Sequence, residues 1–285
     1  MEAVKPTGAS AEMVRRDVAA DFPEGGSAAL RLLKSDHVRS VFENAPRYLN
    51  SRQVDIRVRA ETVKGFAAKV EWHRLLDIGC GDGTISLPLL APANHLTLLD
   101  LSANMAALTQ GKIPEDLAGN VEVRNENFMT ASFVPASFDL IVSVGVMAHV
   151  DSPEEFIAKI TTLLRPGGSL ILEFTDCRHF VGRMGRLLGQ LQEFVAPAKY
   201  RTNKLSFPEM ARILKNYRLQ LTSVFRYATI PIPRIERLLN HGAQYKMVER
   251  VFGKCTDNRT SWLGNEYICL LTFDEATSAV HRSNA

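Results

Sequence analysis

Residues 75–84, with the sequence LLDIGCGDGT, constrain this chain more than any other stretch. The apolar run from Arg74 to Ile78 predicts a short buried strand, and the periodic segment Thr84 to Leu90 predicts a helix after it. The glycines between them predict a turn that needs positive φ or a close approach of the backbone to a ligand. A strand, a glycine turn and a helix in this order are typical of an α/β sheet that presents backbone N–H groups to a bound molecule.

The spacing of the glycines and a leading acid indicate the charge of that molecule. Gly79, Gly81 and Gly83 are one residue short of the dinucleotide pattern G-x-G-x-x-G. Asp77 stands two positions before the first glycine, where it would repel a pyrophosphate and suit a cationic ligand. The stretch resembles motif I of class I S-adenosylmethionine (SAM)-dependent methyltransferases, whose cofactor carries a sulfonium and an ammonium. The resemblance implies that Asp77 and the three glycines bind SAM.

A second acid follows the next predicted strand. Asp100 ends the segment 95–99, about 20 residues beyond the glycine turn, where an acid is placed to accept both hydroxyls of a ribose. The residues after it look like the segment that lies against the adenine in these methyltransferases, so Leu101 and Met105 are predicted cofactor-binding residues. Met105 fits the hydrophobic core equally well.

Two further predicted strands complete the cofactor side. Asn127 and Phe128 follow the strand 121–124; many family members have Asp at the position of Asn127, but its amide oxygen still accepts a hydrogen bond from the adenine amino group. Phe128 is expected to offer its backbone N–H to the adenine ring. The strand 137–144 resembles motif IV, which places Ser143 and Val144 at the end facing the transferred methyl group.

The resemblance runs from Arg74 to Phe174 and includes the turn Arg165-Pro166-Gly167-Gly168. It implies a doubly wound α/β fold with a mostly parallel seven-stranded sheet, a helical N-terminal cap and lid insertions. The predicted organisation is a flexible tail (1–26), a helical cap (27–72), a SAM-binding Rossmann-like core (73–177), a lid insertion (178–205), the C-terminal part of the core (206–274) with a substrate-lid insertion (230–265), and a tail (275–285).

Two residues are candidates for catalysis. His149 follows the motif IV strand, and a histidine can take a proton at neutral pH; the alternative is a role in packing, structural or against SAM. Tyr48 is the polar aromatic residue between two predicted cap helices, where it either packs with a solvated hydroxyl or covers the acceptor.

Composition narrows the acceptor class. The net charge of +3 does not argue for nucleic acid or a membrane, and the motif of amino-directed nucleic-acid methyltransferases is absent after the motif IV strand. The four cysteines have no metal-ligand spacing, and together with the lack of a signal segment they favour a cytoplasmic protein without a metal. We therefore predict a methyltransferase that acts on nitrogen, oxygen or carbon of a small molecule of natural-product or glycan type, with its oligomeric state left open.

Two alternatives remain. Basic residues in the lid insertion 178–205 either form a solvated face or bind an anionic acceptor, such as a prenyl diphosphate methylated at carbon. A non-catalytic SAM-binding module would show the same glycine turn and the same Asp100.

Overall fold

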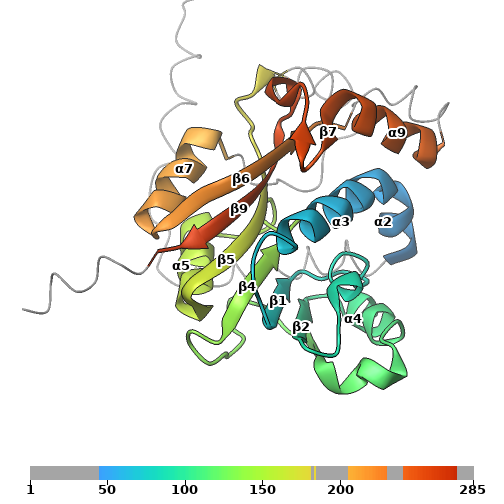
Figure 1. Cartoon of the computed structure of the whole chain (residues 1–285), viewed down its shortest axis with the longest axis vertical. Coiled ribbons are helices and arrows are strands. Elements are labelled where there is room, and N and C mark those ends of the chain that lie inside the picture. Colours follow the sequence, from blue (N-terminus) through green and yellow to red (C-terminus); the bar gives the residue numbers. More distant parts are fainter. Residues whose placement is uncertain (1–44, 181–182, 184–204, 230–239, 275–285) are drawn as a thin grey trace, which may run out of the picture. The chain divides into compact units, whose positions relative to one another are not determined.

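The three-dimensional structure is a computed structural model that describes residues 45–180, 183, 205–229 and 240–274 (Figure 1). All of them fall within one compact unit, residues 38–285. Outside the described residues lie the predicted N-terminal tail (1–26), residues 27–44 of the predicted helical cap, nearly all of the first lid insertion (178–205), residues 230–239 of the second and the C-terminal tail (275–285).

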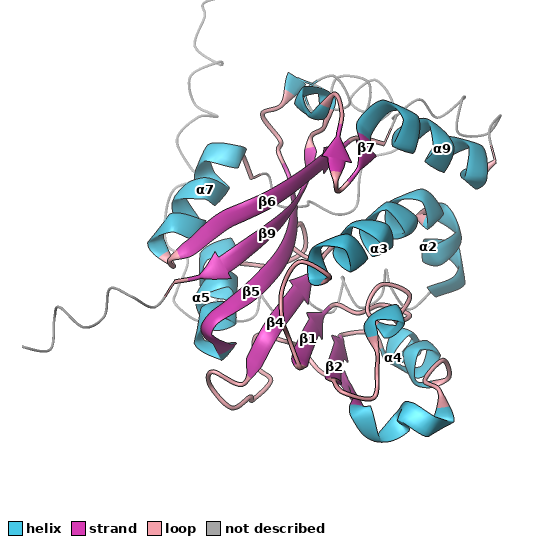
Figure 2. Cartoon of the chain, viewed as in Figure 1, coloured by secondary structure: helices cyan, strands magenta, loops and turns pink. Residues whose placement is uncertain are grey.

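A seven-stranded sheet forms the centre of this unit. Figure 2 shows helices packed on either side of its strands. Its strands lie in the order β3-β2-β1-β4-β5-β9-β6, and β9 is antiparallel to both of its neighbours whereas the other neighbouring pairs are parallel. The bounds of these strands are β1 (Arg74–Ile78), β2 (His95–Asp100), β3 (Val121–Asn125), β4 (Phe138–Ser143), β5 (Leu164–Thr175), β6 (Leu219–Tyr227) and β9 (Glu266–Phe273). A separate two-stranded ribbon pairs β7 (Gly253–Lys254) with β8 (Asp257–Asn258). The predicted fold class is confirmed.

Helices cover both faces of the sheet because successive side chains of a strand point to opposite faces. On one face, side chains such as Leu76 and Leu172 pack with α5 (Pro153–Leu163) and α7 (Phe207–Asn216). On the other, their strand neighbours Leu75 and Ile171 pack with α3 (Gln53–Ala67) and α9 (His241–Phe252). The other helices within the described ranges are α2 (Ala45–Ser51), α4 (Ala103–Gln110) and the short 3-10 turns η1 (Leu87–Leu89), η2 (Glu115–Asn120) and η3 (Ser261–Leu263).

Helix caps explain where several elements begin. Ser152 accepts a hydrogen bond from the N–H of Glu155 at the start of α5, and Pro153 occupies the first helical position. Ser206 and Glu209 form a capping box at the start of α7. Both helices therefore begin at local capping signals.

The predicted helix over Thr84–Leu90 is wrong. The structure has a turn followed by one 3-10 turn, η1. Pro88 cannot donate a backbone hydrogen bond, and Asn94 closes the segment by donating to the carbonyl of Leu89 and accepting from the N–H of Ala91. The glycine turn is therefore followed by a tight loop and not by an α-helix.

The chain order places the reversal of winding direction at one rim of the sheet. β1 is followed by β2 and β3 on one side, whereas β4 and β5 lie on its other side (Figure 1). In open α/β sheets, ligands bind outside the carboxyl ends of the strands where the direction of winding reverses. Here that position is between β1 and β4, directly beyond Ile78.

Candidate functional site

The glycine turn has the backbone that its sequence predicts. Gly79, Gly81 and Gly83 have φ values of 78°, 57° and 78°. A Cβ atom on Gly79 would collide with Val146, and one on Gly83 would lie 2.6 Å from Leu87. A Cβ atom on Gly81 would meet nothing within 4 Å. The outer glycines thus allow close packing of the protein, whereas the middle one borders open space.

Asp100 holds the open part of this turn. Its Oδ2 accepts the N–H of Gly81 at 2.9 Å, and its Oδ1 accepts the N–H of Ser102 at 2.8 Å. Thr109 donates to the carbonyl of Gly81 at 2.8 Å, so both the N–H and the carbonyl of Gly81 are hydrogen-bonded. Burial raises the pKa of Asp100, and the two N–H bonds oppose that shift. Each carboxylate oxygen accepts one bond and retains capacity for another.

Asp77 is a buried acid with one unsatisfied oxygen. The residue is 1% exposed; its Oδ2 accepts the hydroxyl of Ser86 at 2.6 Å, while Oδ1 has no hydrogen-bond partner among the described residues. Burial raises its pKa to about 7, with a further contribution from Asp100 and opposition from the Ser86 bond. An unpaired buried carboxylate oxygen is costly, and a cationic donor would satisfy it.

The residues predicted at the adenine end lie around the carboxyl ends of β2 and β3. Leu101 is half-buried, and Met105 is 1% exposed in α4. Asn127 accepts the N–H of Met129 through Oδ1 at 2.9 Å, which occupies one lone pair of the oxygen expected to face adenine. Phe128 packs edge-on against Phe156, with ring centroids 5.1 Å apart.

The segment 144–150 after β4 lies against the glycine turn. Ser143 is fully buried and its Oγ has no hydrogen-bond partner in the described part of the chain; Val144 is 5% exposed. His149 is half-buried in the turn that follows, and its backbone N–H donates to the carbonyl of Val146 at 2.8 Å. The contact of Val146 with Gly79 joins this segment to the cofactor side of the site.

A buried polar network near the end of β5 was missed by the sequence analysis. Glu173 is 3% exposed, and its Oε2 accepts the N–H of Gly145 at 2.7 Å while its Oε1 accepts the hydroxyl of Tyr227 at 2.9 Å. Arg59 Nε lies 2.7 Å from Oε2 as an ion-pair partner, although its N–H does not point at that oxygen. The sequence signal was present, because Glu173 interrupts an otherwise apolar strand.

Electrostatics within the network follow from burial and proximity. Burial opposes the charge of Arg59, but Glu173, Tyr227 and Tyr48 outweigh it and raise the pKa of the guanidinium. Tyr48, on α2, therefore lies close to the same cluster. Burial also raises the pKa of Glu266 to about 7, reinforced by Glu173, and its Oε2 accepts the hydroxyl of Thr175 at 2.7 Å.

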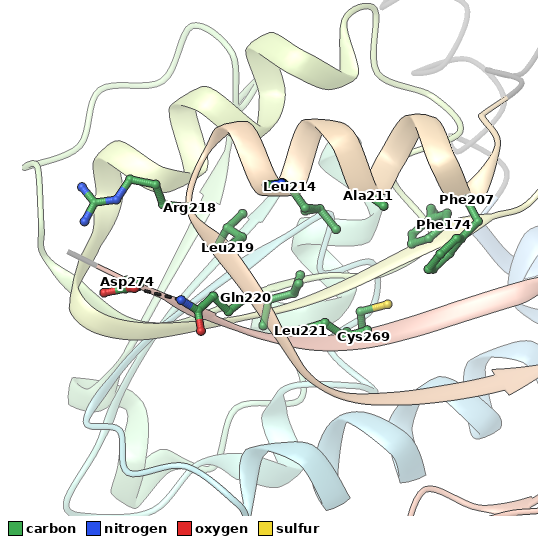
Figure 3. Close-up of a pocket in the computed structure, with 12 residues that line it drawn as sticks. Phe174, Phe207, Ala211, Leu214, Arg218, Leu219, Gln220, Leu221, Cys269 and Asp274 are labelled. Carbon is green, nitrogen blue, oxygen red and sulfur yellow. Dashed lines mark hydrogen bonds between the residues drawn. The ribbon is translucent and has the colours of Figure 1, made fainter. Parts of the chain in front are cut away.

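A cavity of about 470 Å³ lies elsewhere, between α7 and the strands β6 and β9 (Figure 3). Phe174 contributes to its lining, and this side chain points to the opposite face of β5 from its neighbour Glu173. The lining contains none of the residues predicted to bind the cofactor. Tyr227 and Tyr245 are buried in the core, and Trp262 is 63% exposed.

No helix within the described ranges has the length and apolar character needed to cross a bilayer.

Comparisons with known proteins agree with the geometry. A family model described as a methyltransferase domain matches residues 76–172. The ubiquinone biosynthesis O-methyltransferase of Dictyostelium discoideum is 28% identical over 131 residues, which are 42% of this chain and 40% of that protein. The demethylmenaquinone methyltransferase of Listeria welshimeri is 29% identical over 146 residues, which are 48% of this chain and 61% of that protein. The chain thus spans about half the length of these two relatives.

A solved structure shares the fold at low sequence identity. The magnesium protoporphyrin IX methyltransferase of Synechocystis, with bound SAH (S-adenosylhomocysteine), superposes with a TM-score of 0.56 and 16% identity. The match covers 85% of this chain and all of that one, at 100%.

Proposed function

We propose that this chain is a class I SAM-dependent methyltransferase that transfers the methyl group of SAM to a small-molecule acceptor. The observation that carries the proposal is the unpartnered Oδ1 of buried Asp77 beside the open backbone at Gly81. A carboxylate buried without a partner is stabilised by a cation, and SAM offers an ammonium and a sulfonium. The residues present therefore fit this cofactor.

Most of the predicted cofactor residues receive a role in this proposal. Asp77 would accept from the ammonium of SAM, and the backbone at Gly81 would border its amino-acid part. Asp100 would accept the ribose hydroxyls through the lone pairs that its two N–H bonds leave unused. The adenine would lie near Leu101, Met105, Asn127 and Phe128, and the reacting methyl near Ser143 and Val144.

When bound, SAM supplies an electrophilic methyl group, and its positively charged sulfur is the leaving group and becomes a neutral thioether. The chain then has to align the acceptor and exclude water. An acceptor hydroxyl also has to lose its proton, and His149 is the proposed base because it follows the strand end nearest the methyl group. Tyr48 is proposed to close the acceptor side from α2.

The names of the relatives support a ring-shaped acceptor. Two refer to quinone biosynthesis and one to a porphyrin. We propose a small conjugated ring compound methylated at oxygen or carbon. The prenyl diphosphate alternative depends on basic residues of the segment 178–205, nearly all of which lie outside the described residues.

Two measurements test the proposal. Calorimetry with SAM, SAH and NAD should show binding of the first two and no tighter binding of NAD. Release of SAH should then be followed with catechol, 1,4-naphthohydroquinone, protoporphyrin IX and histamine as acceptors. Binding of SAM without release of SAH from any acceptor would favour the non-catalytic module, and tighter binding of NAD would refute the cofactor assignment.

A further inference from the structure

Glu173 is an acidic residue at a buried position of the sheet. It lies near the carboxyl end of β5, on the face that α3 and α9 cover, between the buried apolar residues Leu172 and Phe174. Burying a carboxylate costs several kcal/mol unless it is paired and hydrogen-bonded. A hydrophobic side chain at this point of the core would avoid that cost.

The partners of Glu173 come from three separate segments. Gly145 belongs to the segment after β4, Arg59 to α3 and Tyr227 to the end of β6. Both carboxylate oxygens are engaged, at distances of 2.7–2.9 Å. One side chain therefore joins the segment beside the proposed methyl position to α3 and to the end of β6.

Gly145 is held from two directions. Its N–H donates to Glu173, and its φ of 74° is a conformation that favours glycine. The guanidinium of Arg59 packs over it, so that a Cβ atom would lie 3.1 Å from Nη1. The next residue, Val146, is in contact with Gly79 of the glycine turn. A continuous chain of contacts thus runs from Glu173 through Gly145 and Val146 to the glycine turn.

We propose that Glu173 is a positioning residue of the methyl-transfer site, which holds the segment 144–150 against the glycine turn. This inference rests on the proposed function, because the turn matters only if SAM binds there. Glu173 acts through the backbone of Gly145 and does not itself touch the cofactor. Arg59 of α3 forms an ion pair with the same carboxylate. A displacement of α3 would therefore also displace the segment 144–150 relative to the cofactor.

The test uses SAH, so it needs no identified acceptor. Binding of SAH to the full chain is measured by calorimetry, well below the midpoint of thermal unfolding, for the wild type, Glu173→Ala and Glu173→Gln. The alanine variant removes the hydrogen-bond acceptor for the N–H of Gly145. It should lower the affinity for SAH at least about tenfold, comparable to the loss of one hydrogen bond to a charged group. The glutamine variant keeps an oxygen for the N–H of Gly145 and should restore affinity to within about threefold of the wild type.

Tyr227→Phe is the matched control. It deletes the hydrogen bond to Oε1 but leaves the bond to Gly145, so it should lower stability and change SAH affinity by less than about twofold. Where Glu173→Ala does not fold, because Arg59 is left buried and unpaired, Gly145→Ala displaces the same segment from the other side. It should weaken SAH by a similar factor.

The outcomes separate this inference from the proposed function. If the wild type binds SAH and all four variants bind it equally well, Glu173 is only a structural residue and the inference is wrong. An equal loss of affinity in Tyr227→Phe would also contradict it, since the effect would then come from general destabilisation. If the wild type itself does not bind SAH, the proposed function is refuted, whatever the variants show.

Discussion

Replacing Asp77 with Asn should stabilise the fold and weaken the binding of SAM, two effects of opposite sign from one substitution. Asp77 is 1% exposed and its pKa is raised from 3.8 to about 7. A carboxyl group with a raised pKa binds its proton more tightly in the folded state. Its contribution to stability is therefore fully present below pH 4 and is lost as the pH rises to about 7.

The size of the effect follows from the shift. About three pKa units correspond to about 4 kcal/mol of stability lost between pH 4 and pH 7. Asn is neutral throughout, but its Nδ2 would be a buried donor without a partner, at a cost of about 1–3 kcal/mol. The net gain at pH 8 is therefore about 1–3 kcal/mol. The loss of a charge-assisted bond to the ammonium should weaken SAM by about 1.5–3 kcal/mol, or roughly 10- to 150-fold.

Denaturant unfolding from pH 4 to pH 8 measures the first effect, and calorimetry with SAM at pH 8 measures the second. Glu266 titrates in the same range with the same sign, so the difference between wild type and variant isolates Asp77. Asp116→Asn, at an exposed carboxylate on η2, is the control and should change neither quantity. A variant that is less stable than the wild type at pH 8, or that binds SAM with unchanged affinity, would refute the reasoning.

Three further predictions concern the rest of the site. Gly81→Ala should reduce SAM affinity more than stability because its Cβ would enter open space, whereas Gly83→Ala should mainly destabilise the fold because its Cβ would lie 2.6 Å from Leu87; calorimetry and denaturant unfolding together separate the two. Asp100→Ala should weaken SAM by about 1.5–3 kcal/mol for each ribose hydrogen bond lost, and an unchanged dissociation constant would rule out the ribose role. His149→Ala should leave SAM affinity near the wild-type value but reduce the rate of SAH release at least about 100-fold if His149 is the base, whereas full turnover would make it a packing residue.

The sequence by itself determined the strands at the centre of the sheet and the two acids at its rim. Apolar runs bounded by turn residues predicted the strands β1 and β4, because these signals act over a few residues. Asp77 and Asp100 were recognisable because each stands next to the end of a strand, and the carboxyl ends of neighbouring parallel strands meet at one rim.

Only the tertiary structure decided the buried network around Glu173. Glu173 was one residue of a predicted strand, and its partners Arg59, Gly145 and Tyr227 lie 114, 28 and 54 positions away along the chain. No local sequence pattern predicts that these residues contact one another, because the contacts depend on which helix covers which face of the sheet. The cost of burying Glu173 is likewise set by the finished core, since desolvation arises only when α3 and β6 close over it.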